Sequence, residues 1–411
     1  MEEIIVGIDV GTTKVCTLVG RVEDDGVLRI MGVGIEPSHG IRKGVIVDLE
    51  AASLAISRSV ERAESSSGLE ITSALVSMAG AHVSSINSRG VVSVTGDVID
   101  EFDIARALDS ARAVAIPHNR EVIHVVQRSC TVDGQDGIRT PLGMHGYRLE
   151  IETHIITAST ATVDNLHQCV GAAGVEVQQF VLNPLASADV VLRESERKMG
   201  VVVCDIGGGT TDMAIYVDGK VWHTMVLPVG GNHVTADIAH GLRLAVPQAE
   251  EIKIQQGYAI RAEVGAEDYF AVRPFGEDNV VNINRQELSH IIEARVAEIF
   301  EIALQEIKRS GYDGLLPAGM VLTGGVSALP GIRDLAGEVL GMPVRIAQPE
   351  NLNGMVDQLY SPAYSTSVGL LHWALKMQEN QQDARKGRRS RRRKSPIDLS
   401  GAKDWMKRLL P

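Results

Sequence analysis

Two separate segments of the chain, residues 7–14 and residues 204–212, have almost the same order of residue types. In each, an apolar run ends in an aspartate, a turn rich in glycine and threonine follows, and a second apolar run begins. Glycines allow the backbone to turn tightly, and successive N–H groups in such a turn form a nest for an anion. Two facing hairpins of this kind would clamp a nucleotide triphosphate from both sides.

The residues of these two turns are therefore our candidates for nucleotide binding. They are Gly11, Thr12, Thr13, Lys14, Gly207, Gly208, Gly209, Thr210 and Thr211. Asp9 and Asp205 are candidates for holding a Mg²⁺ ion, directly or through water, because this hard cation prefers oxygen ligands. The competing interpretation is a pair of ordinary β-hairpins, and two copies in the same register argue against it.

A third segment, residues 319–331, is an apolar strand that leads into a turn at Gly324 and Gly325, with a helix expected from about Ile332. Backbone without side chains can approach a flat ring closely, so this turn is a candidate adenine–ribose pocket. In order and type, the three segments resemble the phosphate-1, phosphate-2 and adenosine motifs of the actin-like ATPase superfamily. The dipeptide at residues 219–220 is Gly-Lys without a following serine or threonine, so we expect no P-loop.

Length and composition fit a chain of several domains. Its 411 residues are enough for two or three domains with a large core. The four cysteines are scattered without the spacing of a zinc or redox site, so we expect buried, reduced thiols in a cytoplasmic protein. We expect no signal peptide, and no apolar run reaches the roughly 20 residues that span a bilayer.

The charge is distributed unevenly along the chain. Residues 379–411 carry eleven lysines and arginines against four acidic residues, a net charge of +7, whereas the whole chain has a net charge of −12. Residues 378–395 hold most of the basic run, cannot bury a core, and are expected to form a disordered linker. Nucleic acid competes as a partner for such a run, but the apolar residues beside it favour anionic lipid.

Residues 396–411 have the pattern of an amphipathic helix. One face of this helix would carry Trp405, Met406, Leu409 and Leu410, together with Ala402. The opposite face would carry Lys403, Lys407 and Arg408, together with Asp404. Aromatic and aliphatic residues opposite basic ones are typical of a helix that lies in the plane of a membrane, so these are candidate membrane-binding residues. The competing interpretation is a helix that docks on the body or on a partner.

The remaining pattern predicts an α/β protein with an actin-like, two-lobed ATPase fold. The predicted parts are a first lobe at 1–83, 161–195 and 345–377, an inserted β-α-β-β subdomain at 84–160, and a second lobe at 196–344. Hydrophobic periodicity predicts helices at 47–63, 101–115, 162–172, 185–198, 233–243, 247–256, 286–310 and 364–377. The strands of the inserted subdomain are predicted at 83–95, 121–131 and 148–158.

With the inserted subdomain and the terminal helix added, the order of motifs is similar to that of the FtsA family, bacterial actin-like proteins that tether FtsZ filaments to the membrane. Residues 230–239 and 364–371 also resemble stretches of that family, and the resemblance covers nearly the whole chain. It implies ATP and Mg²⁺ as ligands, and FtsZ, anionic lipids and further copies of the chain as partners. Other division proteins would bind through residues 84–160. The implied location is the cytoplasmic face of the cell membrane at the division site.

The resemblance also assigns three further residues. Residues 249–253 resemble the helix that contacts ribose and adenine in actin-like proteins, which makes Glu250 and Lys253 the expected contacts. The alternative is a surface helix with an i,i+3 charge pair. Relatives such as DnaK and MreB have a glutamate, and actin a glutamine, where this chain has Asn183. An asparagine can hydrogen-bond the attacking water but cannot act as a general base, so we expect ATP binding with at most weak ATPase activity.

Two other functions of the same fold stay open. A sugar kinase would need a catalytic aspartate in the cleft, and no residue matches the kinase pattern. A PilM-like pilus adaptor would share the core and the inserted subdomain, but a terminal membrane helix argues against it. Phosphorylation of a panel of sugars would identify a kinase, and binding to FtsZ would distinguish the division protein from the pilus adaptor.

Overall fold

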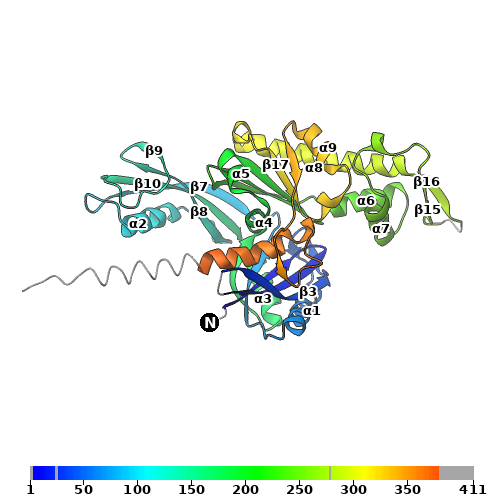
Figure 1. Ribbon diagram of the computed structural model, residues 1–411, viewed down its shortest axis with the longest axis horizontal. Coiled ribbons are helices and arrows are strands. Elements are labelled where there is room, and N and C mark those ends of the chain that lie inside the picture. The colour runs from blue at the N-terminus through cyan, green and yellow to red at the C-terminus, as the bar shows by residue number, and fades with distance from the viewer. Residues whose placement is uncertain (1–2, 24–25, 277–278, 379–411) are drawn as a thin grey trace, which may run out of the picture.

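The computed structural model describes residues 3–23, 26–276 and 279–378. Two lobes, each built on a mixed β-sheet, lie one above the other in Figure 1, and a smaller sheet extends from them at one end of the long axis. Residues 379–411 lie outside the described residues. They include the predicted helix at 396–411 and all of the predicted linker at 378–395 except residue 378. The α/β architecture with two lobes and an inserted subdomain is as predicted.

The first lobe is built on a six-stranded sheet with the order β11-β6-β1-β2-β3-β19. Its strands are β1 (Glu3–Val10), β2 (Lys14–Val22), β3 (Leu28–Pro37), β6 (Ser73–Met78), β11 (Glu176–Leu182) and β19 (Asn353–Gly354). β1, β2 and β3 form an antiparallel meander, and β6 and β11 continue the sheet in parallel with β1. Alternate residues of these buried strands point to opposite faces, so each face has its own apolar core.

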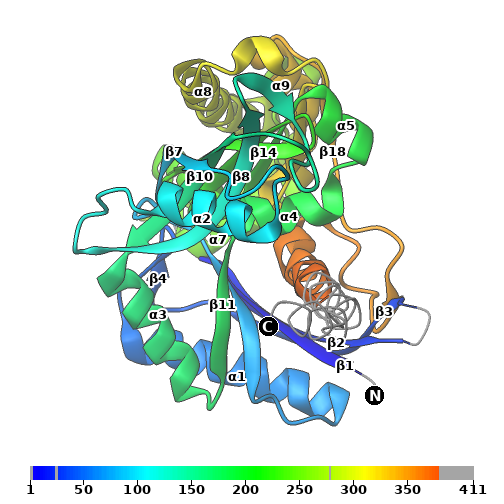
Figure 2. The ribbon, with the colours of Figure 1, turned by 90° about the vertical axis from the view of Figure 1, so that its left-hand side faces the viewer.

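Helices cover both faces of this sheet. α1 (Leu49–Ser67) and α3 (Thr160–Ala172) pack on one face, and a helix at residues 365–378 packs on the other. In Figure 2 this last helix lies between the lobes, beside β1 and β2. It approaches β1 so closely that a Cβ atom added to Gly7 would lie 2.8 Å from the Cβ of Leu370. Glycine at this position is therefore a packing requirement.

The second lobe repeats the strand order of the first. Its five-stranded sheet has the order β14-β13-β12-β17-β18, in which β12, β13 and β14 form an antiparallel meander and β17 and β18 run parallel to β12. The strands are β12 (Val201–Ile206), β13 (Thr211–Val217), β14 (Lys220–Leu227), β17 (Met320–Thr323) and β18 (Val344–Ile346). The strands β3-β2-β1-β6-β11 of the first lobe have the same order and directions. The two lobes are thus two versions of one substructure.

Four helices pack around one large core of the second lobe. They are α6 (Gly231–Gly241), α7 (Val246–Gln256), α8 (Arg285–Ser310) and α9 (Ile332–Leu340). α7 has Pro247 in its first turn and ends at Gly257, as helix start and stop signals predict. A hairpin of β15 (Tyr269–Val272) and β16 (Val281–Asn284), which the sequence pattern did not predict, lies at the end of the molecule opposite the inserted subdomain (Figure 1).

The inserted subdomain is a four-stranded antiparallel sheet with one helix. Its elements are β7 (Ser84–Ser93), α2 (Glu101–Arg112), β8 (Arg120–Val132), β9 (Gln135–Ile138) and β10 (Arg148–Ser159), and the sheet order is β7-β10-β8-β9. These elements occupy the range expected at 84–160. The strand β9 is additional to the predicted β-α-β-β pattern. Asp133 and Gly134 both have positive φ and form the two-residue turn of the β8–β9 hairpin. An Asp-Gly pair is the sequence signal for such a turn.

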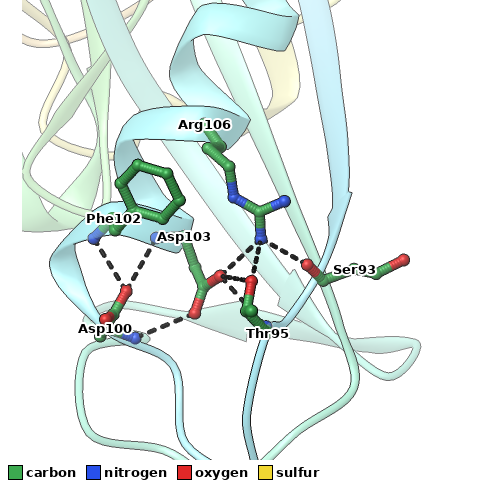
Figure 3. Close-up of polar contacts among 6 residues, drawn as sticks. All are labelled: Ser93, Thr95, Asp100, Phe102, Asp103 and Arg106. Atoms are coloured by element: carbon green, nitrogen blue, oxygen red, sulfur yellow. Dashed lines mark hydrogen bonds and ion pairs between the residues drawn. The ribbon is translucent and has the colours of Figure 1, made fainter.

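A polar network fixes the start of α2 in this subdomain (Figure 3). The side chain of Asp100 accepts hydrogen bonds from the N–H groups of Phe102 and Asp103, which caps the helix. The buried carboxylate of Asp103 in turn accepts from the guanidinium of Arg106 at 2.6 Å. The same guanidinium donates to the carbonyl of Ser93 at the end of β7, so the network joins helix to sheet.

Several predicted helix ends differ from the structure by two to four residues, and one predicted helix and one predicted lobe boundary differ in kind. The single helix predicted at 185–198 is two helices, α4 (Asn183–Val191) and α5 (Glu194–Met199). The break follows from extended backbone at Leu192 and from the side chain of Glu196, which accepts a hydrogen bond from the N–H of Arg193 and so starts a new helix. In addition, the second lobe was expected to end at residue 344, but β18 continues the pairing of its sheet two residues further, to Ile346.

All four cysteines, Cys16, Cys130, Cys169 and Cys204, are buried free thiols, as predicted. Burial raises the pKa of the Cys16 thiol to about 12, so it stays protonated at neutral pH. Within the described part of the chain, no helix combines the length and the apolar character that crossing a membrane requires.

Candidate functional site

A cleft of about 410 Å³ lies between the two lobes, and nearly all the residues expected at a nucleotide site line it. From the first lobe these are Asp9, Gly11, Thr12, Thr13, Lys14 and, at the start of α4, Asn183. From the second lobe they are Asp205, Gly207, Gly208, Gly209, Thr210, Glu250, Lys253, Gly324 and Gly325. The exception is Thr211, which is fully buried in β13 and whose hydroxyl donates to the carbonyl of Val229, away from the cleft.

The two glycine turns have the same local structure. In the turn between β1 and β2, the N–H of Gly11 donates to the carbonyl of Lys14 at 3.0 Å. In the turn between β12 and β13, the N–H of Gly207 donates to the carbonyl of Thr210 at 2.9 Å. Each turn therefore spans four residues and follows an aspartate by one residue. The similarity predicted from sequence extends to the hydrogen bond that closes each turn.

The two turns face each other across the cleft. A Cβ atom on Gly208 would overlap the hydroxyl of Thr13, and a Cβ atom on Gly209 would lie 2.5 Å from the hydroxyl of Thr12. The two glycines thus allow the lobes to approach within contact distance. Backbone N–H groups from two lobes and two threonine hydroxyls converge on one space, which is the arrangement that binds phosphate oxygens.

The aspartates of the two lobes lie at the base of this space, and both are buried. Asp9 accepts hydrogen bonds from the hydroxyls of Ser77 and Ser367, and Asp205 accepts one from the hydroxyl of Thr366. Burial raises the pKa of Asp205 to about 6; the Thr366 hydrogen bond opposes this shift and the charge of Asp9 adds to it. Two buried carboxylates that repel each other form a site that a bound cation would stabilise.

A third carboxylate, Asp212, was not among the predicted site residues although it ends the second motif. It is buried in β13 opposite Asp205, and its Oδ2 accepts a hydrogen bond of 2.7 Å from the hydroxyl of Thr210. Its Oδ1 has no hydrogen-bond partner among the described residues. Burial raises its pKa well above the usual range. The Asp that closes the motif was the available signal, and no role was predicted for it.

The arrangement of these carboxylates indicates how Mg²⁺ could be bound. Among the described residues, no group of three or more histidine, cysteine, aspartate or glutamate side chains could hold a metal ion by itself. Mg²⁺ usually keeps several waters and binds through one or two carboxylates together with substrate phosphates. Asp9 and Asp205, buried below two phosphate-type turns, fit that second mode of binding. They would hold the ion only together with a phosphate ligand and water.

The residues expected to contact adenine and ribose also line the cleft, and Gly324 lies directly beside Asp205. Gly324 has φ 85°, and a Cβ atom there would lie 2.6 Å from the carbonyl oxygen of Ile206, so only glycine fits. The predicted i,i+3 pair on α7 does form, with Lys253 Nζ 2.7 Å from Glu250 Oε2. Lys253 also donates to the hydroxyl of Thr235 at 2.9 Å. The pair lines the cleft and is not simply a surface charge pair.

Two residues assigned from resemblance have informative surroundings. The ammonium of Lys14 donates a hydrogen bond of 2.5 Å to the carbonyl of Ala363 and lies 4.5 Å from the ring centre of Tyr364. Asn183 has a buried Oδ1 without a hydrogen-bond partner among the described residues. Asn183 lines the cleft, and an unpartnered amide oxygen is able to accept a hydrogen bond from water, which is the role that the resemblance implies.

Further residues of the cleft were missed. Gly44, at the tip of the hairpin of β4 (Ile41–Arg42) and β5 (Val45–Ile46), lines the cleft and donates its N–H to the hydroxyl of Thr12 at 3.3 Å. Ala363 and Thr366 line it from the segment that leads into the final helix. Residues 364–371 were noted only as a family-like stretch, and nothing local in that stretch signals contact with the two aspartates.

Comparison with known protein families agrees with this architecture. The family model described as "Cell division protein FtsA" matches residues 202–369, and the model described as "SHS2 domain inserted in FTSA" matches residues 80–157. The second match coincides with the inserted subdomain. The two models together therefore cover the second lobe and the added sheet.

Individual relatives match over nearly the full length. The chain is 43% identical over 378 residues to the cell division protein FtsA of Pseudomonas aeruginosa, with 92% of this chain and 91% of that protein covered. It is 40% identical over 374 residues to FtsA of Neisseria meningitidis, with 91% and 90% covered. It is 36% identical over 379 residues to FtsA of Escherichia coli K12, with 90% of each covered.

Solved structures of lower identity share the fold. The structure titled "PilM-PilN type IV pilus biogenesis complex" matches with a TM-score of 0.64 at 16% identity, covering 90% of this chain and 98% of that one. MreB5 of Spiroplasma citri bound to ADP matches with a TM-score of 0.57 at 14% identity, covering 92% and 98%. The predicted actin-like fold is confirmed. The chain belongs to the FtsA family of cell division proteins.

Proposed function

We propose that this chain binds ATP with Mg²⁺ in the cleft between its lobes and, in that state, tethers FtsZ filaments to the cytoplasmic membrane at the division site. The observation that carries the nucleotide part is the pair of matching turns that face each other above two buried aspartates. A further support is that MreB5, a protein of the same fold, has structures with ADP and with AMPPNP.

Different residues of the cleft would bind different parts of ATP–Mg²⁺. Backbone N–H groups of the two turns, with the hydroxyls of Thr12 and Thr13, would bind the phosphates. Asp9 and Asp205 would hold Mg²⁺ through water and phosphate oxygens, and the cation would neutralise charge between the lobes. The Glu250–Lys253 pair and the turn at Gly324 would receive ribose and adenine. Each lobe contributes to the phosphate site, so the ligand would stabilise the closed arrangement.

Hydrolysis would be weak. Asn183 lines the cleft and would orient a water, but an amide has no basic group that could remove a proton from it. The bound nucleotide would therefore act mainly as a structural ligand.

The nucleotide part is tested by thermal unfolding with and without ATP–Mg²⁺. A ligand of the native state stabilises it by RT ln(1 + [L]/Kd), about 2.7 kcal/mol at a hundredfold excess over Kd. Asp205→Ala should abolish this stabilisation, and Thr12→Val should reduce it less. Asp268→Ala, a half-exposed aspartate outside the cleft, is the matched control. Equal stabilisation of the Asp205→Ala variant by ATP would contradict the assignment of the cleft.

The tethering part depends on residues 379–411 and on partners. Trp405, Met406, Leu409 and Leu410 would enter the lipid interface, and the basic run would bind anionic lipid, each Lys or Arg adding about 1 kcal/mol near the surface. Further copies of the chain would assemble into an actin-like polymer, and other division proteins would bind the inserted subdomain. Many weak anchors on one polymer would together bind firmly.

Co-sedimentation with anionic liposomes, with and without FtsZ and ATP, tests this part. Trp405→Glu should release the chain from liposomes and should therefore remove FtsZ from the pellet. Neutralising Arg391 to Lys394 should weaken binding in a way that depends on salt. Liposome binding that survives deletion of residues 396–411 would show instead that this segment docks on a protein.

A further inference from the structure

One turn of the final helix contacts the aspartates of both lobes. The hydroxyl of Thr366 donates a hydrogen bond of 2.9 Å to Asp205 Oδ2 in the second lobe. The hydroxyl of the next residue, Ser367, donates one of 2.7 Å to Asp9 Oδ2 in the first lobe. Both donors are buried, as both carboxylates are. Two adjacent residues thus connect groups that lie in different lobes and far apart in the chain.

The residues just before this turn also contact both lobes. The hydroxyl of Ser365 lies 2.6 Å from the hydroxyl of Thr323 at the end of β17, and the N–H of Gly324 donates to the carbonyl of Pro362 at 3.1 Å. On the other side, Lys14 of the first lobe donates to the carbonyl of Ala363. Residues 362–367 therefore form a continuous connection between the lobes at the base of the cleft.

The hydrogen bonds fix the orientation of each carboxylate. Asp9 has both oxygens occupied by hydroxyl donors, Ser77 on Oδ1 and Ser367 on Oδ2. Asp205 has Oδ2 bonded to Thr366, while its Oδ1 faces Gly324, where a side chain would overlap it. Neither carboxylate can rotate without breaking a buried hydrogen bond. Groups that hold the ligands of a metal in this way raise its affinity, because the ligands need not be ordered when the metal binds.

We propose that Thr366 and Ser367 are positioning residues for the cation that accompanies the nucleotide: they hold one carboxylate of each lobe at a fixed separation and orientation. Each hydroxyl would act on the cation through the carboxylate that it holds, although Thr366 also lines the cleft. Because the two donors are neighbours on one helical turn, the spacing of the carboxylates is set by the geometry of the helix. The inference rests on the proposed binding of ATP–Mg²⁺ and adds the residues that determine its Mg²⁺ dependence.

A purely structural role of these hydroxyls would have a different signature. Ser365 is equally buried, lies on the same turn and joins the same helix to the second lobe, but its partner is a hydroxyl and not a carboxylate. Loss of the Ser365 hydroxyl would therefore affect stability without affecting the cation. Ser365→Ala is for this reason the matched control for Thr366→Val and Ser367→Ala.

The test measures the affinity of a fluorescent ATP analogue for the full chain, once with Mg²⁺ and once with EDTA. The ratio of the two affinities reports the cation alone. Thr366→Val and Ser367→Ala should each reduce this ratio roughly tenfold, the size expected for one lost hydrogen bond to a charged group. Their affinities in EDTA should change less than about twofold. Thr366→Ser keeps the hydroxyl and should restore the wild-type ratio, and Ser365→Ala should leave it unchanged.

Three outcomes would overturn the inference. One is an unchanged ratio in both Thr366→Val and Ser367→Ala, and another is an equal loss in Ser365→Ala. The third is failure of Thr366→Ser to restore the ratio. Ser367→Ala tests the other lobe, so the inference can be judged even if Thr366→Val does not fold. A wild-type chain that binds no ATP would instead overturn the proposed function, whereas binding with an unchanged ratio in the variants overturns this inference alone.

Discussion

The imidazole of His154 on β10 lies 2.9 Å, through its Nε2, from the hydroxyl of Thr224 on β14. Its Nδ1 lies 2.8 Å from the side-chain oxygen of Asn87 on β7. The inserted subdomain interrupts the first lobe in the chain, yet this buried histidine joins it to the second lobe. The neighbouring charged or titratable groups are His223, with its ring centre 5.8 Å away, and Arg128.

Burial, together with the charges of nearby His223 and Arg128, lowers the pKa of His154 to about 3. In the unfolded chain this histidine has a pKa of about 6.5, so between about pH 3 and about pH 6.5 the unfolded chain binds one more proton than the folded chain. The contribution of His154 to the free energy of unfolding is therefore fully present above about pH 6.5 and is lost as the pH decreases. When the pH is lowered from about 7.5 to about 5.5, the free energy of unfolding of His154→Gln should fall by about 1.4 kcal/mol less than that of the wild type. Urea unfolding at both pH values measures this difference, and exposed His118→Gln is the control. Identical pH dependence of wild type and His154→Gln would refute the prediction.

The facing turns predict a large effect of one added methyl group. Gly208→Ala should weaken ATP binding roughly tenfold, because the new Cβ overlaps Thr13 and forces the lobes apart. Gly207→Ala is the matched control in the same turn: its Cβ would lie 3.5 Å from the carbonyl oxygen of Thr210, an ordinary contact. Isothermal titration with ATP–Mg²⁺ measures both. Similar affinities of the two variants would mean that the turns do not need to meet.

The charge pair on α7 predicts a contact with the sugar of the ligand. Glu250→Ala should weaken ATP binding by about fivefold, as expected for the loss of about one hydrogen bond. If Glu250 contacts the ribose 2′-hydroxyl, the same substitution should change the affinity for 2′-deoxy-ATP less. The adjacent Glu251→Ala is the control, because that side chain is exposed and its hydrogen-bond partner among the described residues is Gln255. Equal losses for both nucleotides would place Glu250 away from the ribose.

The network of Figure 3 predicts that stability and nucleotide binding can be separated. Asp103→Asn removes the ion pair with Arg106 and should destabilise the inserted subdomain by about 2 kcal/mol, since the charged acceptor of the hydrogen bonds from Arg106 and from the N–H of Asp100 is lost. Asp109→Asn, on the same helix with an exposed carboxylate 3.4 Å from Arg112, should change stability by less than about 0.5 kcal/mol. Denaturant unfolding followed by circular dichroism measures both. Neither should alter ATP affinity, and a loss in Asp103→Asn would connect the subdomain to the cleft.

The phosphate-type turns could be predicted because their information is local. An aspartate, a few glycines and threonines within one turn determine both the hydrogen bond that closes the turn and the exposure of its N–H groups. The repetition of the motif at residues 7–14 and 204–212 then indicated two lobes and one shared site. The start and end of α7, marked by Pro247 and Gly257, were equally local signals.

What could not be predicted depends on contacts between distant residues. Thr366 and Asp205 are 161 positions apart, and Ser367 and Asp9 are 358 positions apart, so no spacing in the sequence links them. The break between α4 and α5 depends on where Leu192 packs in the core, which periodicity does not report. The extra strand β9 is a different case: its Asp133-Gly134 turn was a readable signal that the prediction did not use.

The matching lobes are nearly symmetric, but the symmetry fails where they meet. Strand order and turn closure are the same in both lobes, whereas the residues that face each other across the cleft are threonines in the first lobe and glycines in the second. Threonines in both turns would collide there, since even a Cβ atom on Gly208 would overlap the hydroxyl of Thr13. The lobes can therefore close on a ligand only as complementary halves, and two copies of the first lobe could not replace the pair.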